Sequence, residues 1–203
     1  YSGYGESSGA PSEEDVCADI EAAYLYLTGE CRISGEHIIC YGQSIGSVPT
    51  VDLAVSCNVG GVVLHSALKS GLSVLHNVKG TYWFDVFQNA KKIRRVRAPV
   101  FVLHGVQDAF IPLDHGRTLY EACPVGMAFD PWWVQEAGHN DIESRHREAY
   151  YEHLARFLEA LDSAERDWAG ASRSEGDDES DGDGGGSERD AFRPLIPPRR
   201  TKL

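Results

Sequence analysis

A serine, an aspartate and a histidine occur in surroundings that fit one kind of chemistry. Ser44 is the centre of Gly42-Gln43-Ser44-Ile45-Gly46, which follows a short apolar run and precedes apolar residues at helical spacing. A Gly-x-Ser-x-Gly pattern between a strand and a helix is typical of a nucleophile elbow, a sharp turn that presents a serine hydroxyl. A serine becomes a good nucleophile only beside a base, usually a histidine that a carboxylate orients. The pattern therefore predicts that Ser44 is a nucleophile whose partners lie downstream.

Asp108 and His139 are the predicted acid and base. Asp108 follows the apolar run 99–103, and His139 follows the shorter run 132–134. In enzymes with this elbow the chain order is serine, acid, histidine, with each residue at the carboxyl end of a strand. The sequence has this order, so we expect the three side chains to meet at one edge of a sheet.

Other residues compete for the same roles. His65 and His104 also end apolar runs, and we expect them to form hydrogen bonds at the rim of the site. Asp114 fits better as a helix cap, and Asp141 fits better as a brace for the loop of the predicted base. Two further serines lack the elbow pattern, namely Ser8 and Ser66.

The turn around Ser44 carries further expectations. Side chains at positions 42 and 46 are expected to collide with the strand and the helix that the turn connects. The backbone N–H of Ile45 is the expected donor to the oxyanion of the tetrahedral intermediate. The second donor comes from the loop after an earlier strand. We expect that strand upstream of Tyr1, because the chain does not begin with methionine and is expected to be a fragment. We therefore expect a fragment that is poorly folded or inactive on its own.

Strand and helix patterns alternate along the chain. Apolar runs lie at 38–41, 59–64, 99–103 and 132–134, and helical patterns lie at about 13–28, 47–54, 88–96, 114–122 and 150–161. This alternation predicts an α/β fold with a mostly parallel sheet covered by helices on both faces. Together with the elbow it predicts the α/β-hydrolase fold, lacking its N-terminal strands.

The composition changes near residue 162. We expect a hydrolase domain at residues 1–161 and an acidic, Ser/Gly/Asp-rich tail at 162–203. Residues 172–190 have almost no apolar side chain to bury, which predicts disorder. The terminal Thr201-Lys202-Leu203 differs by one residue from the peroxisomal address Ser-Lys-Leu, and we favour coincidence as the explanation.

Composition excludes several other classes of protein. The formal net charge of −12 argues against a general nucleic-acid-binding surface. The five scattered cysteines show no metal-ligand spacing, which indicates reduced thiols in the cytosol and no bound metal. No signal peptide or membrane-spanning run is present in the sequence, and the predicted chemistry needs no cofactor.

Several motifs together resemble the α/β-hydrolase domain-containing protein 17 family, from Tyr1 to about Leu161. The most specific are the two longest, Tyr41-Gly42-Gln43-Ser44-Ile45-Gly46-Ser47-Val48-Pro49-Thr50 and Gly138-His139-Asn140-Asp141-Ile142-Glu143; shorter ones lie at 1–9, 18–22, 63–66 and 81–85. The resemblance implies a membrane-associated serine hydrolase that removes palmitoyl groups from cysteines of other proteins. It places nucleophile, acid and base on Ser44, Asp108 and His139.

The resemblance also implies a location and partners. S-palmitoylated proteins are the expected substrates, met at the cytosolic face of membranes through peripheral contact. The family's N-terminal portion, with an acylated cysteine cluster, is absent from this sequence, and the oligomeric state stays open. The acidic tail has no counterpart that we associate with the family.

Two further segments bear on these expectations. The apolar residues of an insertion are candidates for the cap of an acyl pocket or for ordinary core: Leu72, Val74, Leu75, Tyr82, Trp83, Phe84 and Phe87. A basic cluster is a candidate for contact with anionic lipid, although a solvated helix face is the favoured interpretation: Lys91, Lys92, Arg94, Arg95 and Arg97.

Other functions remain open. A carboxylesterase, a lysophospholipase or a serine peptidase would use the same three residues, and only the shape of the pocket would separate them. A non-catalytic scaffold that keeps the fold is the third alternative.

Overall fold

The computed structural model describes residues 1–71 and 88–174, with side chains up to residue 164. Within these ranges four parallel strands form one sheet in the order β1-β2-β3-β4. The strands are β1 (Ile39–Gln43), β2 (Gly61–His65), β3 (Val100–Gly105) and β4 (Trp132–Val134). Every residue of β2 and β3 is buried, as expected of central strands in a parallel sheet.

The register brings the carboxyl ends of the strands together. Gln43 pairs with His65, His65 pairs with Leu103, and Leu103 pairs with Trp132. The loop after each strand therefore leaves from the same edge of the sheet. These loops carry the three predicted site residues.

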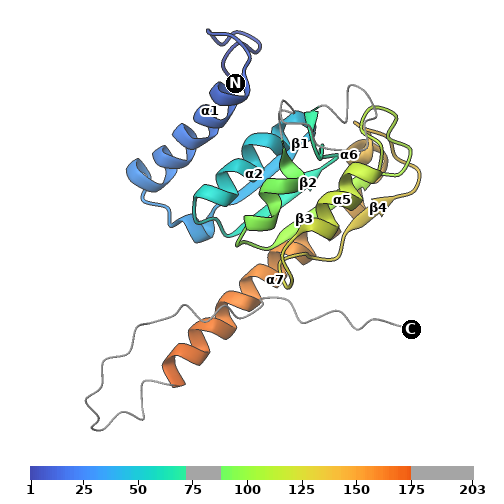
Figure 1. The fold of residues 1–203 in the computed structure, drawn as a ribbon. Helices are drawn as coiled ribbons and strands as arrows, with labels where there is room; N and C mark the ends of the chain where they lie inside the picture. Colours follow the sequence, from blue (N-terminus) through green and yellow to red (C-terminus); the bar gives the residue numbers. More distant parts are fainter. Residues whose placement is uncertain (72–87, 175–203) are drawn as a thin grey trace.

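Helices cover both faces of the described sheet (Figure 1). One face, with Val62, Leu64, Val100 and Val102, packs against α2 (Ser47–Ser56), α4 (Asn89–Lys92), the 3₁₀ turn η4 (Ile93–Arg95) and α5 (Asp114–Ala122). The opposite face, with Val63, Phe101 and Leu103, packs against α6 (Ile142–Arg145) and α7 (Arg147–Ser174). Alternate residues of a strand point to opposite faces, so the two cores follow directly from the strand pattern.

The N-terminal helix packs outside α2. Helix α1 (Glu13–Leu25) begins after Ser12, whose hydroxyl accepts the N–H of Asp15, and acidic residues fill its first turn. The chain continues as a π-helical turn, η1 (Tyr26–Glu30), so the helical path runs through Gly29, where we expected an end. A short 3₁₀ turn, η2 (Gly35–His37), then leads into β1.

The structure corrects one expected boundary. Helix α7 continues past residue 161 to Ser174, so residues 162–174 are helical, where the sequence analysis placed the start of the tail. Residues 162–174 include three alanines, one glutamate and two arginines, which favour helix even without a regular apolar stripe. The remaining tail residues, 175–203, lie outside the described residues, and so does the apolar insertion at 72–87.

Two observations concern other expectations. All five cysteines lie in the described ranges, and none of them forms a disulfide. Among the residues that the structure describes, no helix is long and apolar enough to cross a membrane.

Candidate active site

Ser44 lies at a sharp turn between β1 and α2. Its φ of 53° is in the left-handed region, which is uncommon for a residue with a side chain. The turn continues as one 3₁₀ turn, η3 (Ser44–Gly46), and then enters α2. The strand, strained serine and helix expected of a nucleophile elbow are therefore all present.

The two glycines of the turn differ in their surroundings. A Cβ at Gly42 would lie 2.6 Å from the carbonyl oxygen of Gly46 and 2.6 Å from Oγ1 of Thr50, so a side chain does not fit there. Among the described residues, a Cβ at Gly46 would meet only the hydroxyl of Tyr1, at an ordinary contact distance of 3.6 Å. The expected collision is therefore confirmed at position 42 and wrong at position 46. The reason is that backbone and side-chain atoms of α2 crowd position 42, whereas at position 46 the contact from the described residues is the Tyr1 hydroxyl.

A buried polar clamp holds the backbone of the elbow from behind. The hydroxyl of Ser47 donates to the carbonyl oxygen of Ser44 at 2.6 Å. The Nδ2 amide of Asn89 donates to the same Ser47 hydroxyl at 3.2 Å and to the carbonyl oxygen of Leu68 at 2.9 Å. Both Ser47 and Asn89 are fully buried. This clamp was not predicted. Its only local signal in the sequence is the amide of Asn89 at the start of a helical pattern.

Asp108 lies on the loop after β3, and both oxygens of its carboxylate accept hydrogen bonds. Its Oδ1 accepts the backbone N–H groups of Phe110 at 2.9 Å and Ile111 at 2.8 Å. Its Oδ2 faces Nδ1 of His139 at 2.7 Å. Burial by itself would raise the pKa of Asp108, but hydrogen bonds from two histidines and from the N–H of Ile111 outweigh it and lower the pKa to about 2. The carboxylate is therefore ionised at neutral pH.

His139 joins the acid to the serine. It lies on the loop after β4, and its Nε2 is 3.0 Å from Oγ of Ser44. Because an ionised carboxylate can only accept, Nδ1–H of His139 donates to Asp108, and Nε2 is left to accept the hydroxyl proton of Ser44. The side chain of His139 is 11% exposed and that of Asp108 is fully buried. The structure thus brings all three predicted residues into one hydrogen-bonded chain.

The competing residues have other partners. Asp114 is the first residue of α5 and pairs with Nζ of Lys69 at 2.6 Å. Asp141 accepts the N–H of Gly138 at 2.6 Å, so it braces the loop of His139 as expected. His65 is buried, with Nδ1 2.6 Å from the hydroxyl of Tyr41, and burial is the main reason that its pKa falls to about 4.

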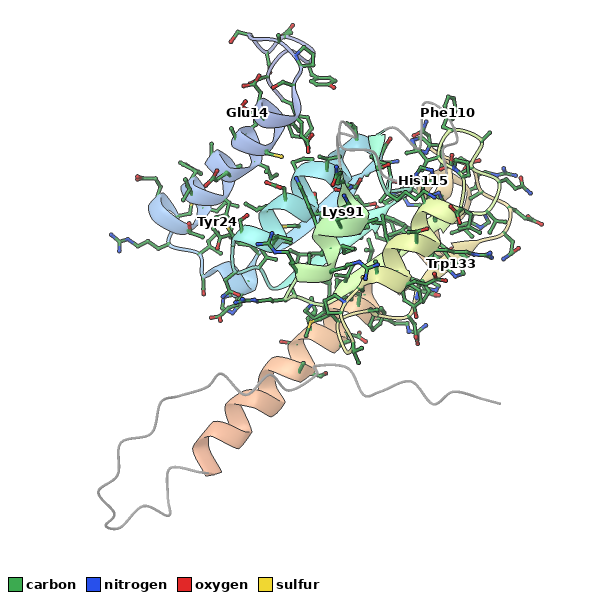
Figure 2. All side chains as sticks on the ribbon, viewed as in Figure 1. Glu14, Tyr24, Lys91, Phe110, His115 and Trp133 are labelled. Atoms are coloured by element: carbon green, nitrogen blue, oxygen red, sulfur yellow. The ribbon has the colours of Figure 1, made fainter. Side chains whose placement is uncertain are left out.

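The structure also describes the predicted oxyanion donor and the basic cluster. Ile45 follows Ser44 directly, at the position expected of an oxyanion donor, and this role of its N–H stays a prediction. In the basic cluster, Lys92 forms ion pairs with Asp52 at 2.6 Å and Glu13 at 3.5 Å. Lys91, which is labelled on α4 in Figure 2, is exposed, as are Arg94, Arg95 and Arg97.

One exposed aromatic residue lies beside the site. Phe110 is 73% exposed, and its ring centroid is 5.7 Å from that of His139. It lies on the loop between β3 and α5, near the first turn of α5, where His115 is labelled (Figure 2). Its backbone N–H is held by Asp108, so the backbone that carries this apolar ring is held at the rim of the site.

The sequence matches curated proteins, although no family model matches it. It is 50% identical over 159 residues to α/β hydrolase domain-containing protein 17C of Mus musculus, which covers 78% of this chain and 48% of the relative. The 17C protein of Homo sapiens is also 50% identical, with 47% of its length covered, and the 17B protein of Xenopus laevis is 47% identical, with 54% covered. Over this region the chain belongs to the α/β-hydrolase domain-containing protein 17 family. It spans about half the length of the curated relatives that it matches.

Solved structures place this family member in a known fold. An esterase from Pyrococcus furiosus matches with a TM-score of 0.62 at 17% identity, covering 76% of this chain and 66% of the esterase. A monoacylglycerol lipase from Paleococcus ferrophilus matches with a TM-score of 0.58 at 17% identity, covering 79% and 81%. An acylaminoacyl peptidase from Pyrococcus horikoshii matches with 0.58 at 18% identity, covering 75% and 30%. The chain therefore has the α/β-hydrolase fold.

Proposed function

We propose that this chain carries the catalytic triad of a serine hydrolase that cleaves acyl thioesters, with palmitoylated cysteines of other proteins as its substrates. The observation that supports the reaction best is the hydrogen-bonded chain from Ser44 through His139 to Asp108. The finer substrate rests on the resemblance to the protein 17 family. Contact with the cytosolic face of membranes is part of the same proposal.

The acylation step uses each member of the triad. Oγ of Ser44 attacks the thioester carbonyl carbon while Nε2 of His139 takes the hydroxyl proton. The negative charge on the carbonyl oxygen is stabilised by backbone N–H groups, of which that of Ile45 is one. The ionised carboxylate of Asp108 holds the imidazole in place and stabilises its positive charge. Collapse of the intermediate breaks the carbon–sulfur bond, and His139 returns the proton to the cysteine sulfur.

The second half of the cycle releases the fatty acid. A water molecule gives a proton to Nε2 of His139 and attacks the acyl carbon of the ester on Ser44. Collapse of this intermediate breaks the bond to Oγ, which regains the proton from His139. The products are a free thiol and a carboxylic acid, and the serine is restored.

Phe110 supports an apolar acyl group over a charged one. An exposed phenyl ring beside the base would contact the first methylenes of a chain bonded to Ser44. A contact of this kind is worth about 25 cal/mol for each Å² removed from water. The insertion at 72–87, a candidate for a cap or for ordinary core, lies outside the described residues.

Other hydrolases would use the same triad. The likeness to an esterase, a lipase and a peptidase is a likeness of fold, so it does not choose among ester, thioester and amide substrates. A non-catalytic scaffold has no need of a complete triad, so the geometry speaks against it.

A fluorophosphonate probe separates enzyme from scaffold, because it forms a covalent bond only with an activated serine. The protein expressed from its native gene should be labelled, Ser44→Ala should not, and Ser56→Ala, which removes an exposed serine of α2, should be labelled like the parent. Turnover of matched palmitoyl thioester, oxyester and amide peptides then identifies the substrate class. Labelling that persists in Ser44→Ala would refute the proposal, and a preference for the oxyester or the amide would refute its thioester part.

A further inference from the structure

His104 is a second histidine in contact with Asp108. It lies near the carboxyl end of β3, and its side chain is fully buried. Its Nε2 is 2.8 Å from the carbonyl oxygen of Ile111 and 3.4 Å from Oδ2 of Asp108. The proposed mechanism gives this imidazole no role.

The contacts of His104 determine its tautomer. A carbonyl oxygen and an ionised carboxylate can both only accept a hydrogen bond, so Nε2 of His104 has to carry the proton. Its Nδ1 is buried and has no hydrogen-bond partner among the described residues. A buried N–H without a partner is rarer in proteins than an acceptor without one, so the neutral form protonated on Nε2 fits the surroundings of both ring nitrogens.

Gly116 on α5 makes room for this ring. A Cβ at position 116 would lie 2.7 Å from Nδ1 of His104 and 3.2 Å from its Cγ. The imidazole is therefore confined between the strand and the helix and cannot swing away from Asp108. Position 116 also closes the side of the ring from which a donor to Nδ1 could approach.

Oδ2 of Asp108 consequently faces two imidazoles. One is the proposed base, His139, at 2.7 Å, and the other is His104 at 3.4 Å. The bond from His104 to Ile111 also fixes the far end of the loop whose N–H groups hold Oδ1 of Asp108. His104 thus acts on the acid in two ways, through the charge on Oδ2 and through the shape of the loop.

We propose that His104 is a positioning residue of the hydrolase site, a neutral Nε2–H donor that holds the acid loop in place and shares Oδ2 of Asp108 with the base. The inference deepens the proposed function, because it assigns a role to a residue beside the same triad. His104 does not touch the reacting atoms and acts only through Asp108.

Other charged or titratable groups also face Asp108 and His139. His65 of β2 interacts electrostatically with both of them, and His115 of α5 interacts with Asp108. Glu143 of α6 lies beside His65, and Lys69 and Asp114 lie beside His115. Burial is the main reason that the pKa values of His65 and His115 fall to about 4, so these two are neutral at pH 7. Lys69 is paired with Asp114, and the two imidazoles in contact with the acid are those of His139 and His104.

Long-range ¹H–¹⁵N correlation NMR of the imidazoles in the full chain tests the tautomer without any turnover. At pH 7 we expect His104 to be neutral and protonated on Nε2. A ring protonated on Nδ1 would overturn the proposal, and so would a doubly protonated ring. Because the spectrum needs no substrate, a failure of the hydrolase proposal and a failure of this one are separate results.

Variants test the role itself. His104→Leu removes the donor, and we expect kcat to fall by ~10- to 100-fold with little change in KM, since the loss acts on the transition state. His104→Gln places an amide N–H near the former Nε2 position and should recover most of that activity. A Gln variant as impaired as the Leu variant, although equally well folded, would contradict the proposal.

The pH profile distinguishes positioning from simple packing. Without the donor, the negative charge on Oδ2 interacts more strongly with the imidazolium of His139. This favours the protonated form of the base. The acidic limb of kcat/KM in His104→Leu should therefore move to higher pH by ~0.5 to 1 unit, and His104→Gln should move it back. His115→Asn, which alters a buried histidine with no bond to Asp108, should leave the limb in place. An unshifted limb in His104→Leu would mean a merely structural role.

Discussion

Nδ1 of His139 lies 2.7 Å from Oδ2 of Asp108, although 31 residues separate the two in the sequence. The parallel register causes this proximity, because the loops after β3 and β4 leave the sheet side by side. The same edge carries Ser44 after β1, two strands away from β3. The site is therefore a direct product of the sheet, and substitutions can test each part of it.

The acid orients the base, so replacing it should affect rate far more than binding. We expect Asp108→Asn to lower kcat about 10⁴-fold, because an amide no longer stabilises the imidazolium or selects the tautomer of His139. KM for a soluble thioester should change little. The matched variant Asp141→Asn, on the loop that carries the base, should retain activity to within about tenfold. Similar losses in the two variants would contradict the assignment of Asp108 as the acid.

The two glycines of the elbow should respond differently to alanine. Gly42→Ala forces a methyl group against the carbonyl oxygen of Gly46 and the side chain of Thr50, and such overpacking costs about 1–3 kcal/mol or more. At position 46 the described residues approach a methyl group only at an ordinary contact distance, so Gly46→Ala should be close to neutral. Urea denaturation and probe labelling of both variants check this. Equal behaviour of the two would show that the steric difference has no consequence.

The polar clamp behind the elbow should contribute to both stability and reactivity. Ser47→Ala removes the donor to the carbonyl oxygen of Ser44 and leaves the amide of Asn89 with one partner fewer. We expect a loss of about 1–3 kcal/mol in the free energy of unfolding, together with slower fluorophosphonate labelling. Ser56→Ala, at the exposed end of the same helix, should alter neither. Labelling at the parent rate in Ser47→Ala would separate the clamp from the geometry of the nucleophile.

Acid should weaken the fold through buried histidines. The pKa of His115 falls to about 4, mainly through burial, so the unfolded chain binds a proton between about pH 6.5 and 4 that the folded chain does not. The free energy of unfolding should therefore fall as the pH is lowered through this window. His115→Asn, which keeps an acceptor for the N–H of Lys69, should reduce this pH dependence, whereas Ser56→Ala at an exposed position should not. Urea midpoints at pH 7 and pH 5 provide the measurement, and parallel changes in all three proteins would refute it.

Asp108, which is negatively charged, should affect the stability of the fold at a lower pH than His115. Its pKa is about 2 in the folded protein, below its ordinary value of 3.8, so the stability that it contributes is present above pH 3.8. This contribution is lost as the pH falls from 3.8 towards 2. Acid unfolding of Asp108→Asn should be less steep than that of the parent in this range. An unchanged slope would show that the carboxylate does not depend on its donors.

Phe110 should affect substrate choice without affecting the chemistry. We expect Phe110→Ala to raise KM for long acyl thioesters several-fold and to leave acetyl thioesters unchanged, because an acetyl group has no methylenes to contact the ring. Tyr151→Ala removes another exposed aromatic residue, 57% exposed on α7, and serves as the control. A uniform effect on all chain lengths would point to the placement of His139 instead.

The parts of the site that the sequence predicted share one property. Ser44, Asp108 and His139 each follow an apolar run, and parallel pairing forces the ends of such runs to one edge. Their chemical types then allow few arrangements. The fold class followed for the same reason, since the period of the apolar residues specifies strand or helix and their order specifies a parallel sheet.

The parts that were missed depend on tertiary contacts or on weak local signals. Asn89 and Ser47 are 42 residues apart, and an amide at the start of a helical pattern does not identify its partner. The space beside Gly46 depends on the direction in which the chain leaves the turn, which a five-residue motif does not specify. The end of α7 was placed too early because the loss of apolar spacing was taken as the loss of helix, whereas alanine, glutamate and arginine continue one.

The contact between Gly116 and His104 has a consequence for engineering and for evolution. Glycine within a helix is ordinarily a position where alanine increases stability, by about 1 kcal/mol. In α5 the same exchange would push a methyl group into the imidazole that supports the acid loop. The two positions should therefore vary together among homologues, with a larger residue at 116 accompanied by a smaller one at 104. A stabilisation strategy that treats residues independently would select the wrong substitution here.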